Sequence, residues 1–278
     1  MKKYIVLLTT LIFSLPTNTF GQSDLEPWSY NRPAVKQRKP VPHRYSSESN
    51  TKYHKRIDRI IDTREKQNLP MHWPKNAFYD IIYCAVTDPD CRDGNVTAYT
   101  SDSLENGGSY SRFEALARGS DTIDVPVIDS LGGITYTPVP VPFEPADIKK
   151  YRIMEDWLFD YKYSDFRPRI IAIAPIFELR TSGIPIGEAS LFWIKMDELR
   201  PVLARRELFN PYNNAARISF DDWFEMRMFA SYIVKESNVW DYDLKYYPKN
   251  EDNPMATLLN AEEIKNDLFV FEHDLWEY

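Results

Sequence analysis

Apolar residues recur at helical spacing in two stretches early in the chain. In the first stretch, Tyr53–Lys66, three isoleucines and Arg64 share one helical face, and Leu69-Pro70 would end the helix. In the second stretch, Asn76 can cap a helix whose apolar stripe runs toward a cysteine. The pattern therefore predicts two helices. Their apolar positions are Ile57, Ile60 and Ile61 in the first, and Phe78, Ile81, Ile82 and Ala85 in the second.

The residues that follow lack such periodicity. Glycine, serine and aspartate are frequent over residues 92–135, which predicts short strands and long loops. Residues 125–145 are dense in proline, and proline alternates with other residues over 137–142. Because proline has no backbone N–H for a sheet ladder, this stretch favours an edge strand or an extended connector. Residues 125–145 are therefore the candidate boundary between two lobes.

Regular apolar patterns return in the second half of the chain. Pro145 and Asp147 predict the start of a helix. Residues 169–177 are nearly all apolar, which is typical of a buried strand, and residues 190–195 are its expected partner after the turn at Ser182-Gly183. The face of the predicted helix carries Ile148, Tyr151, Met154, Leu158 and Tyr161.

Three further helices are predicted toward the C-terminus. Residues 197–206 favour a helix. Ser219 caps a helix that is apolar on most sides and extends through Lys235. Asn260 and Glu263 form the capping box of the last helix. Together the patterns predict an α+β fold, in which a mixed or antiparallel sheet packs with several helices and follows an extended N-terminal arm.

Residues 1–21 have the three parts of a secretory signal peptide. Lys2 and Lys3 provide a positive start, residues 4–15 form a short apolar stretch, and Gly21 can precede the cleavage point. The apolar stretch is too short to remain as a membrane anchor. The alternative interpretation is the buried first helix of a cytosolic domain, but the segment lacks the acidic residues that a solvent face would carry. We therefore expect an exported mature chain.

Composition narrows the class of protein further. No cysteine lies near the expected cleavage point, so a lipid anchor has no acceptor there. No later segment approaches the roughly 18 consecutive apolar residues of a membrane span. The net charge of −7 gives the whole chain no electrostatic case for nucleic acid. We expect a soluble chain that contacts membranes only through partners, with a globular domain over residues 51–278.

Charge is distributed unevenly between the two ends of the mature chain. Residues 22–50 form a proline-rich basic arm with almost no aliphatic residues, which predicts an extended segment. Residues 32–66 carry 11 Lys or Arg against 4 Asp or Glu, whereas residues 241–278 carry 3 against 10. Two interpretations are open: solvated faces of opposite sign, or a contact in which one subunit's arm binds a neighbour's acidic end. The candidate interaction residues of the arm are Arg32, Lys36, Arg38 and Lys39.

The chain has two cysteines, Cys84 and Cys91. An Asp-Pro-Asp turn between them can bring the sulfurs together, and exported cysteine pairs commonly form disulfides. A bridge across so short a loop would stabilise the fold by roughly 2–3 kcal/mol on the chain-entropy model. Free buried thiols are the alternative. Two cysteines cannot complete a zinc site on their own, and His72 is the only histidine nearby.

No catalytic constellation stands out. The histidines lack metal-ligand spacing, and there is neither a Gly-x-Ser-x-Gly elbow nor a phosphate-binding loop. His273 lies between two acids, but consecutive residues of a helix point in different directions and cannot act together. The helix dipole explains Asp221-Asp222 at a helix start. We predict no catalytic, cofactor-binding or metal-binding residue. A periplasmic hydrolase or glycan-binding module, suggested by abundant Trp, Tyr and carboxylates, is the alternative.

Several blocks, in a fixed order from about Arg56 onward, resemble one known family. The blocks are Asp62–Pro70, Glu155–Asp160, Arg169–Pro175, Ser219–Phe224, Lys235–Asn238 and Glu272–Glu277. Ordered blocks over most of the mature chain are far more specific than a single motif. They are similar to the GldN family of gliding-motility proteins, called PorN in non-gliding relatives, of the type IX secretion system of Bacteroidota. The cysteine pair is not part of this pattern.

The resemblance implies a non-enzymatic ring subunit in the periplasm, associated with the inner face of the outer membrane through its partners. The implied partners are an outer-membrane lipoprotein of the GldK/PorK type, the periplasmic domain of a GldM/PorM-type motor protein, and further copies of the chain within the ring. The assembly would serve protein secretion and gliding motility. The family supplies no catalytic residues to carry over, and no cofactor.

Overall fold

The computed structural model describes residues 38–88, 96–104, 108–118, 121–128, 134–141, 148–181, 184–250 and 253–275. All of these residues belong to one compact unit, Val35–Tyr278. The expected signal peptide and the first part of the basic arm, with Arg32 and Lys36, lie outside the described residues.

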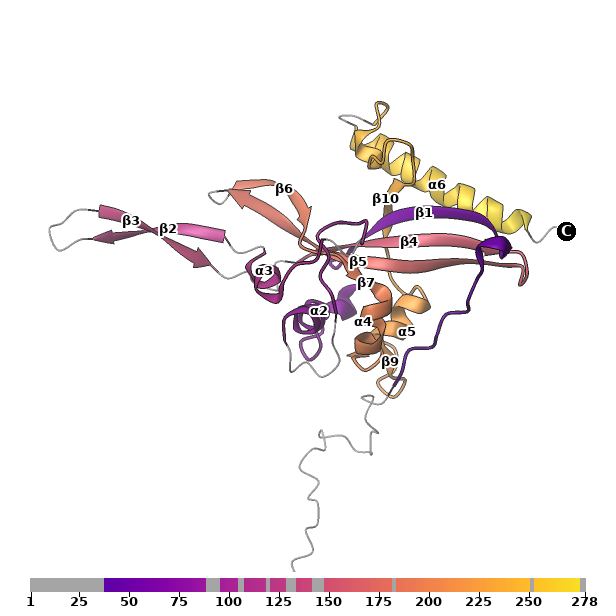
Figure 1. Ribbon diagram of the computed structural model, residues 1–278, viewed down its shortest axis with the longest axis horizontal. Coiled ribbons are helices and arrows are strands. Elements are labelled where there is room, and N and C mark those ends of the chain that lie inside the picture. Colours follow the sequence, from indigo (N-terminus) through magenta and orange to yellow (C-terminus); the bar gives the residue numbers. More distant parts are fainter. Residues whose placement is uncertain are drawn as a thin grey trace, which may run out of the picture. The chain divides into compact units, whose positions relative to one another are not determined.

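An antiparallel sheet, called here the central sheet, forms the middle of the fold (Figure 1). Its strand order is β10-β1-β4-β5-β6, and β7 also pairs with β5. Every paired neighbour runs antiparallel. The strands are β1 (Thr51–Asp62), β4 (Lys150–Asp160), β5 (Asp165–Thr181), β6 (Ile184–Ser190), β7 (Ile194–Lys195) and β10 (Tyr232–Glu236). Two strand pairs lie off this sheet: β2 (Asp121–Ile128) with β3 (Ile134–Val141), and β8 (Glu207–Leu208) with β9 (Ile218–Ser219).

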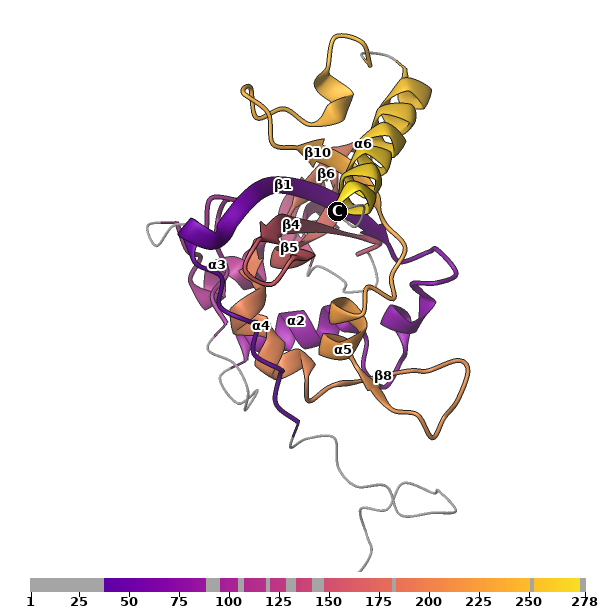
Figure 2. The ribbon, with the colours of Figure 1, turned by 90° about the vertical axis from the view of Figure 1, so that its right-hand side faces the viewer.

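Helices α2, α4 and α5 gather below β4 and β5 in Figure 2, whereas α6 lies beside β1 and β10. No helix among the described residues is long and apolar enough to cross a membrane. An antiparallel sheet packed with several helices confirms the predicted α+β class. The helices are α2 (Phe78–Thr87), α3 (Arg112–Ala117), α4 (Met196–Leu203), α5 (Phe220–Glu225) and α6 (Pro254–Asp274), with 3-10 turns η2 (Glu48–Asn50), η3 (Leu69–His72) and η5 (Leu244–Tyr246).

Two of the three apolar clusters among the described residues concern the site. The larger one, the main core, lies between the central sheet and α2, α4 and α5. At its centre the ring of Phe78 lies 4.9 Å from that of Tyr151 and 5.3 Å from that of Phe220. The smaller one, the α6 cluster, joins the inner face of α6 to β1 and β10. Its buried members are Ile57, Ile233, Leu244, Ala261 and Leu268.

The helix predicted over Tyr53–Lys66 is wrong, because this segment contains strand β1. Ile57 and Ile61 are both fully buried and four residues apart. A spacing of four places two side chains on the same face of a strand as well as of a helix. Pairing with β4 along the whole of β1 decides between the two, and the β-branched isoleucines suit a strand.

The helix predicted from Pro145 is wrong for a related reason, since Lys150–Asp160 is strand β4. β4 lies between β1 and β5, and its first half is covered on both faces. Tyr151, Ile153 and Met154 are all buried there. A strand that is buried on both faces does not alternate between apolar and polar residues, so its pattern can resemble a helical one.

The strand predicted over residues 169–177 is confirmed as part of the longer β5. Its expected partner over residues 190–195 is confirmed only in part. β6, which ends at Ser190, supplies most of the pairing, while β7 pairs at Ala172 and Ile173. The helix predicted over residues 197–206 is confirmed as α4, one residue earlier at its start and three residues shorter at its end.

Ser219 caps a helix as predicted, but the helix does not extend to Lys235. Its hydroxyl accepts the backbone N–H of Asp222 over 3.1 Å and completes a capping box. α5 ends at Glu225, and the chain then passes through Arg227, whose φ of 53° lies in the left-handed region. A right-handed helix cannot continue through that conformation, and β10 follows instead.

The last helix begins earlier than predicted. Asn253 caps α6 by accepting the backbone N–H of Ala256 over 3.2 Å, and Pro254 occupies the first turn. The capping box predicted at Asn260 and Glu263 is therefore wrong. Asn260 lies inside the helix and donates to Asn250 Oδ1 over 2.9 Å.

The helix predicted after Asn76 is confirmed as α2, although Asn76 does not cap it. Its side chain donates instead to the carbonyl of Glu207 over 3.1 Å. Between residues 92 and 135 the prediction of short strands and loops missed the short helix α3, which has a capping box of Ser111 and Glu114. The lobe boundary near residues 125–145 stays a prediction, because part of that stretch lies outside the described residues.

Candidate functional site

Residues 38–47, called here the N-terminal strap, form neither a helix nor a strand before η2 and β1 begin. Pro40 and Pro42 favour an extended backbone and remove two backbone donors. Ser46 attaches the end of the strap to β4, because its hydroxyl donates to Asp160 Oδ2 over 2.7 Å. The strap is thus held by side chains, not by a sheet ladder.

Two arginines of the domain donate to carbonyl groups of the strap. Arg200 on α4 donates through Nη2 to the carbonyl of Val41 over 2.7 Å. Arg169 on β5 donates through Nη2 to the carbonyl of Arg44. Because neither contact uses a side chain of the strap, these contacts fix the path of its backbone whatever residues it carries.

Arg200 is itself fixed by a buried ion pair. Its Nε donates to Asp221 Oδ1 over 2.8 Å, and both side chains are almost fully buried between α4 and α5. Asp221 follows the helix start, as the dipole argument expected, but its carboxylate is used by Arg200. Removing one partner of such a buried pair typically costs about 3–5 kcal/mol. The pair therefore anchors both the helix contact and the strap.

Charged side chains of the strap pair with α5 of the same chain. Arg38 Nη1 lies 3.2 Å from Asp222 Oδ2, and His43 Nε2 lies 3.4 Å from Glu225 Oε1. Burial lowers the pKa of His43 and, together with nearby arginines, outweighs the opposing charge of Glu225. A cavity of 480 Å³ lies beside these residues, between the strap, β5 and α5.

The structure describes two of the four candidate interaction residues of the arm. Arg38 is paired within its own chain, and Lys39 is exposed. Whether the arm contacts a neighbour stays a prediction. Sequence reasoning missed Arg200 and Asp160 as the groups that receive the strap. No local pattern connects them to residues more than a hundred positions away.

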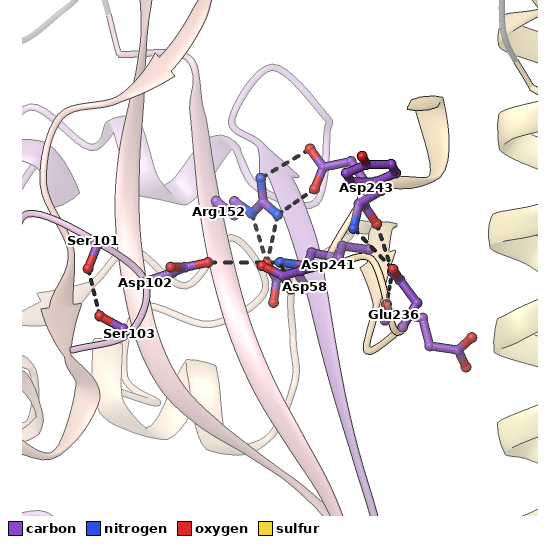
Figure 3. A network of polar contacts seen from close by, with 11 residues as sticks. Asp58, Ser101, Asp102, Ser103, Arg152, Glu236, Asp241 and Asp243 are labelled. Atoms are coloured by element: carbon purple, nitrogen blue, oxygen red, sulfur yellow. Dashed lines mark hydrogen bonds and ion pairs between the residues drawn. The ribbon is translucent and has the colours of Figure 1, made fainter. Parts of the chain in front are cut away.

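A second charged network joins three strands of the central sheet (Figure 3). Arg152 on β4 donates through Nη2 to Asp58 Oδ2 on β1 and to Asp243 Oδ1, over 2.7 Å each. Burial raises the pKa of Asp58, against the lowering effect of Arg152. Lys235 on β10 forms an ion pair with Asp241 at 2.6 Å. The network ties the turn after β10 to the sheet.

Asn238 organises that turn. Its Nδ2 donates to the carbonyls of Glu236 and Tyr242, over 2.8 Å each, and its Oδ1 accepts the backbone N–H of Trp240 over 3.1 Å. The turn leaves the side chains of Val239 and Trp240 95% and 70% exposed. Because tryptophan is frequent among the residues that dominate protein interfaces, this exposed pair is a candidate contact for another protein.

An ion pair with one fully buried partner links the main core to the α6 cluster. Glu155 on β4 is fully buried and forms an ion pair with Arg227 Nη2 at 3.0 Å. The guanidinium of Arg227 lies over the rings of Trp157 and Phe229, at 5.6 and 5.4 Å from their centroids. Those rings belong to the α6 cluster and the main core respectively. The ion pair with Arg227 accounts for a carboxylate at a fully buried position of β4.

Of the other residues considered in the sequence analysis, the structure describes Cys84 and His273 but not Cys91. Cys84 lies in α2, but Cys91 lies outside the described residues, so the disulfide stays a prediction. His273 lies in the last turn of α6. Within the described part of the chain, no group of three or more His, Cys, Asp or Glu residues could hold a metal ion. The arrangements found here bind and orient segments of the chain.

A comparison with protein families identifies the family of this chain. The sequence model of the family described as "Gliding motility associated protein GldN" matches residues 46–277. The chain belongs to the GldN family. A comparison with curated proteins finds no match.

The matched region of this GldN-family chain starts at the end of the strap and includes the central sheet, α2 to α6, the Arg152 network and the Glu155–Arg227 pair. The family is described by gliding motility and not by an enzymatic reaction. Membership therefore makes the chain a component of the gliding-motility machinery. Two of the blocks that suggested this family, Glu155–Asp160 and Lys235–Asn238, contain the buried Glu155 and the turn-forming Asn238.

Proposed function

We propose that this chain is a non-enzymatic structural subunit of the type IX secretion and gliding-motility machinery in the periplasm, where it forms a ring-like complex with an outer-membrane lipoprotein. The family match over residues 46–277 carries the proposal. Support also comes from the networks described above, which fix backbone segments and hold an exposed turn in place. A subunit that transmits load between partners needs such rigid presentation.

The proposed partners are an outer-membrane lipoprotein of the GldK/PorK type and the periplasmic part of a GldM/PorM-type motor protein. The test is affinity purification of the protein from its own envelope, with the co-purifying chains identified by mass. We expect the lipoprotein in an amount comparable to the chain itself, and loss of gliding or type IX secretion when the chain is deleted. A monomeric protein without an envelope partner, in cells that still secrete, would contradict the proposal.

The basic arm is proposed to strengthen these associations. Reversing the charges at Arg32, Lys36 and Lys39 should weaken co-purification at low salt, and the difference from the unchanged protein should shrink at high salt, because salt screens the interactions between charges. Arg38 is treated separately, since it also pairs with Asp222 of its own chain. Equal recovery of partners by the charge-reversed and unchanged proteins at every salt concentration would reduce the arm to a linker.

A further inference from the structure

An apolar groove lies beside the β8–β9 pair. It has a volume of 990 Å³ and is formed by residues 66–74, residues 208–218, Trp223 and Met228. Its floor is rigid, because Trp223 and Leu208 are buried members of the main core. Its wall contains the rings of Trp73 and Phe209, whose centroids lie 5.9 Å apart.

Much of the apolar surface at this groove is open to solvent. Tyr212, next to Pro211 on its edge, is 90% exposed, and Leu69 and Phe209 are also exposed. A monomer seldom leaves a concave apolar surface with exposed aromatic side chains uncovered unless it binds something. The aromatic and aliphatic lining suits an apolar occupant.

The surroundings of the groove are basic. Residues 62–75 and 205–217, which include its two main walls, carry six Lys or Arg and three Asp or Glu, and among them Arg64 is paired with Asp62 and Arg217 with Glu207. An occupant with negative charges beside its apolar residues would therefore be attracted to this groove, and a basic one would be repelled.

The outer face of α6 matches this description. Its inner face is occupied by the α6 cluster, but Met255, Leu258 and Leu259 are 64%, 52% and 64% exposed. Their spacing of three and four residues places them together on one side of the helix. We call these three residues the α6 ridge. Glu262 and Glu263 follow one turn later, and α6 as a whole carries five Asp or Glu and one Lys.

The ridge and the groove of one copy do not face each other. In Figure 2, α6 lies beside β1 at one end of the view, and the β8 segment lies beyond α5 at the other. The groove adjoins the main core, whereas α6 packs through the separate α6 cluster. A contact between them must therefore join two copies of the chain.

We propose that the groove of one copy binds the α6 ridge of a second copy, as an amphipathic helix binds an apolar groove. Leu258 and Leu259 enter the groove, and Glu262 and Glu263 face its basic rim. The contact is heterologous, so a pair of copies keeps one unoccupied groove and one unoccupied ridge, and successive copies can close into a ring. This inference rests on the proposed function only for the size and place of the assembly; the contact itself is defined by the two surfaces.

The test places a photo-crosslinking amino acid, p-benzoylphenylalanine, at Tyr212 of the full chain in its own cells. After illumination we expect a product of twice the chain mass, with the crosslink mapping to residues 254–263 of the second copy. The same amino acid at Tyr161, an exposed position on another surface, should give no crosslink to those residues.

Charge placed on the ridge supplies the matched variants. Leu258→Asp with Leu259→Asp should lower the yield of the crosslinked dimer at least tenfold. Phe269→Asp, an equally exposed position of α6 outside the ridge, should leave the yield unchanged. Circular dichroism and the unfolding temperature of both variants check that α6 remains folded, which we expect because all three side chains point outward.

Three results would overturn the inference: a crosslink from Tyr212 only to another envelope protein, a crosslink to a different part of the second copy, or an unchanged dimer yield in the double variant. Failure of the proposed function is seen separately, in gliding, secretion and co-purification of the lipoprotein. A chain that crosslinks through the ridge but recovers no lipoprotein would keep the contact and refute the larger assembly.

Discussion

The N-terminal strap and helix α6 are attached to the same domain by different forces. The strap has no regular structure, and its backbone is held by Arg200 and Arg169. α6 is a capped helix of 21 residues that places Ala261 and Leu268 in an apolar cluster. One attachment depends on a few directed polar contacts and the other on buried apolar area.

The two segments respond to different solution conditions. Exposed ion pairs weaken with salt and with titration of either partner, whereas apolar burial is largely insensitive to both. The strap can therefore be loosened without disturbing the main core. Loosening α6 would uncover Ile57 and Ile233 on the central sheet.

The largest loss of unfolding free energy is expected at Arg200, where the strap meets the main core. Arg200→Ala should lower the free energy of unfolding by about 3–5 kcal/mol, because Asp221 is left buried without its partner. Urea unfolding followed by tryptophan fluorescence measures the loss. As a control, the double change Arg200→Met with Asp221→Leu removes both charges and should lose much less. A small loss in the single variant would show that water reaches Asp221.

A slightly smaller loss of unfolding free energy is expected for a change in the α6 cluster. Leu268→Ala removes a buried side chain from the contact with β1 and β10, which should cost about 2–4 kcal/mol of unfolding free energy. The neighbouring Phe269→Ala, at an exposed position, should stay within about 0.5 kcal/mol of the unchanged protein. Equal losses for the two positions would mean that α6 is turned differently on the sheet.

Elements with a strong local pattern could be predicted from the sequence, whereas elements that depend on long-range contacts could not. The buried strand at residues 169–177 and helix α2 follow strong local patterns, and both were predicted correctly. β1 and β4 were not, because a spacing of four fits helix and strand alike and because β4 is covered on both faces. In these cases pairing between distant segments decided the structure.

The site was less predictable than the fold. Asp221 was visible as an acid at a helix start, but nothing nearby indicates that Arg200 would bury itself against it. Asn253-Pro254 did carry a readable pattern, since asparagine before proline is typical of a helix cap and first turn. The pair Asn260 and Glu263, which fits the capping-box spacing, predicts a later start of the helix. Long-range contacts of the strap have no counterpart in local patterns.

A small, salt-dependent effect is expected at the exposed end of the strap. Arg38→Ala removes the ion pair with Asp222, and both side chains are partly exposed, so the cost should be about 0.2–1 kcal/mol of unfolding free energy. The difference from the unchanged protein should shrink further at 1 M salt. Urea unfolding at low and high salt measures both values. A loss that is independent of salt would point to packing of the arginine stem instead of its charge.

The smallest effect is a dependence on pH at His43. Its pKa in the folded chain is lowered, so the unfolded chain binds a proton first as the pH falls below the ordinary value of 6.5. The contribution of His43 to stability is therefore fully present above that value. It is lost as the pH falls through the window between 6.5 and the lower pKa of the folded chain. His43→Gln should remove this part of the pH dependence, measured by urea unfolding at intervals from pH 8 to 5.

Glu225→Gln provides the opposing test of the same contact. Glu225 raises the pKa of His43, whereas burial, Arg200 and Arg169 lower it. Removing the carboxylate should therefore lower the pKa of His43 further and steepen the loss of stability on acidification. If the His43→Gln chain and the unchanged protein lose stability equally with falling pH, the strap is not held by this titrating contact. Its attachment would then depend on the other contacts of the strap, including the carbonyl contacts of Arg200 and Arg169.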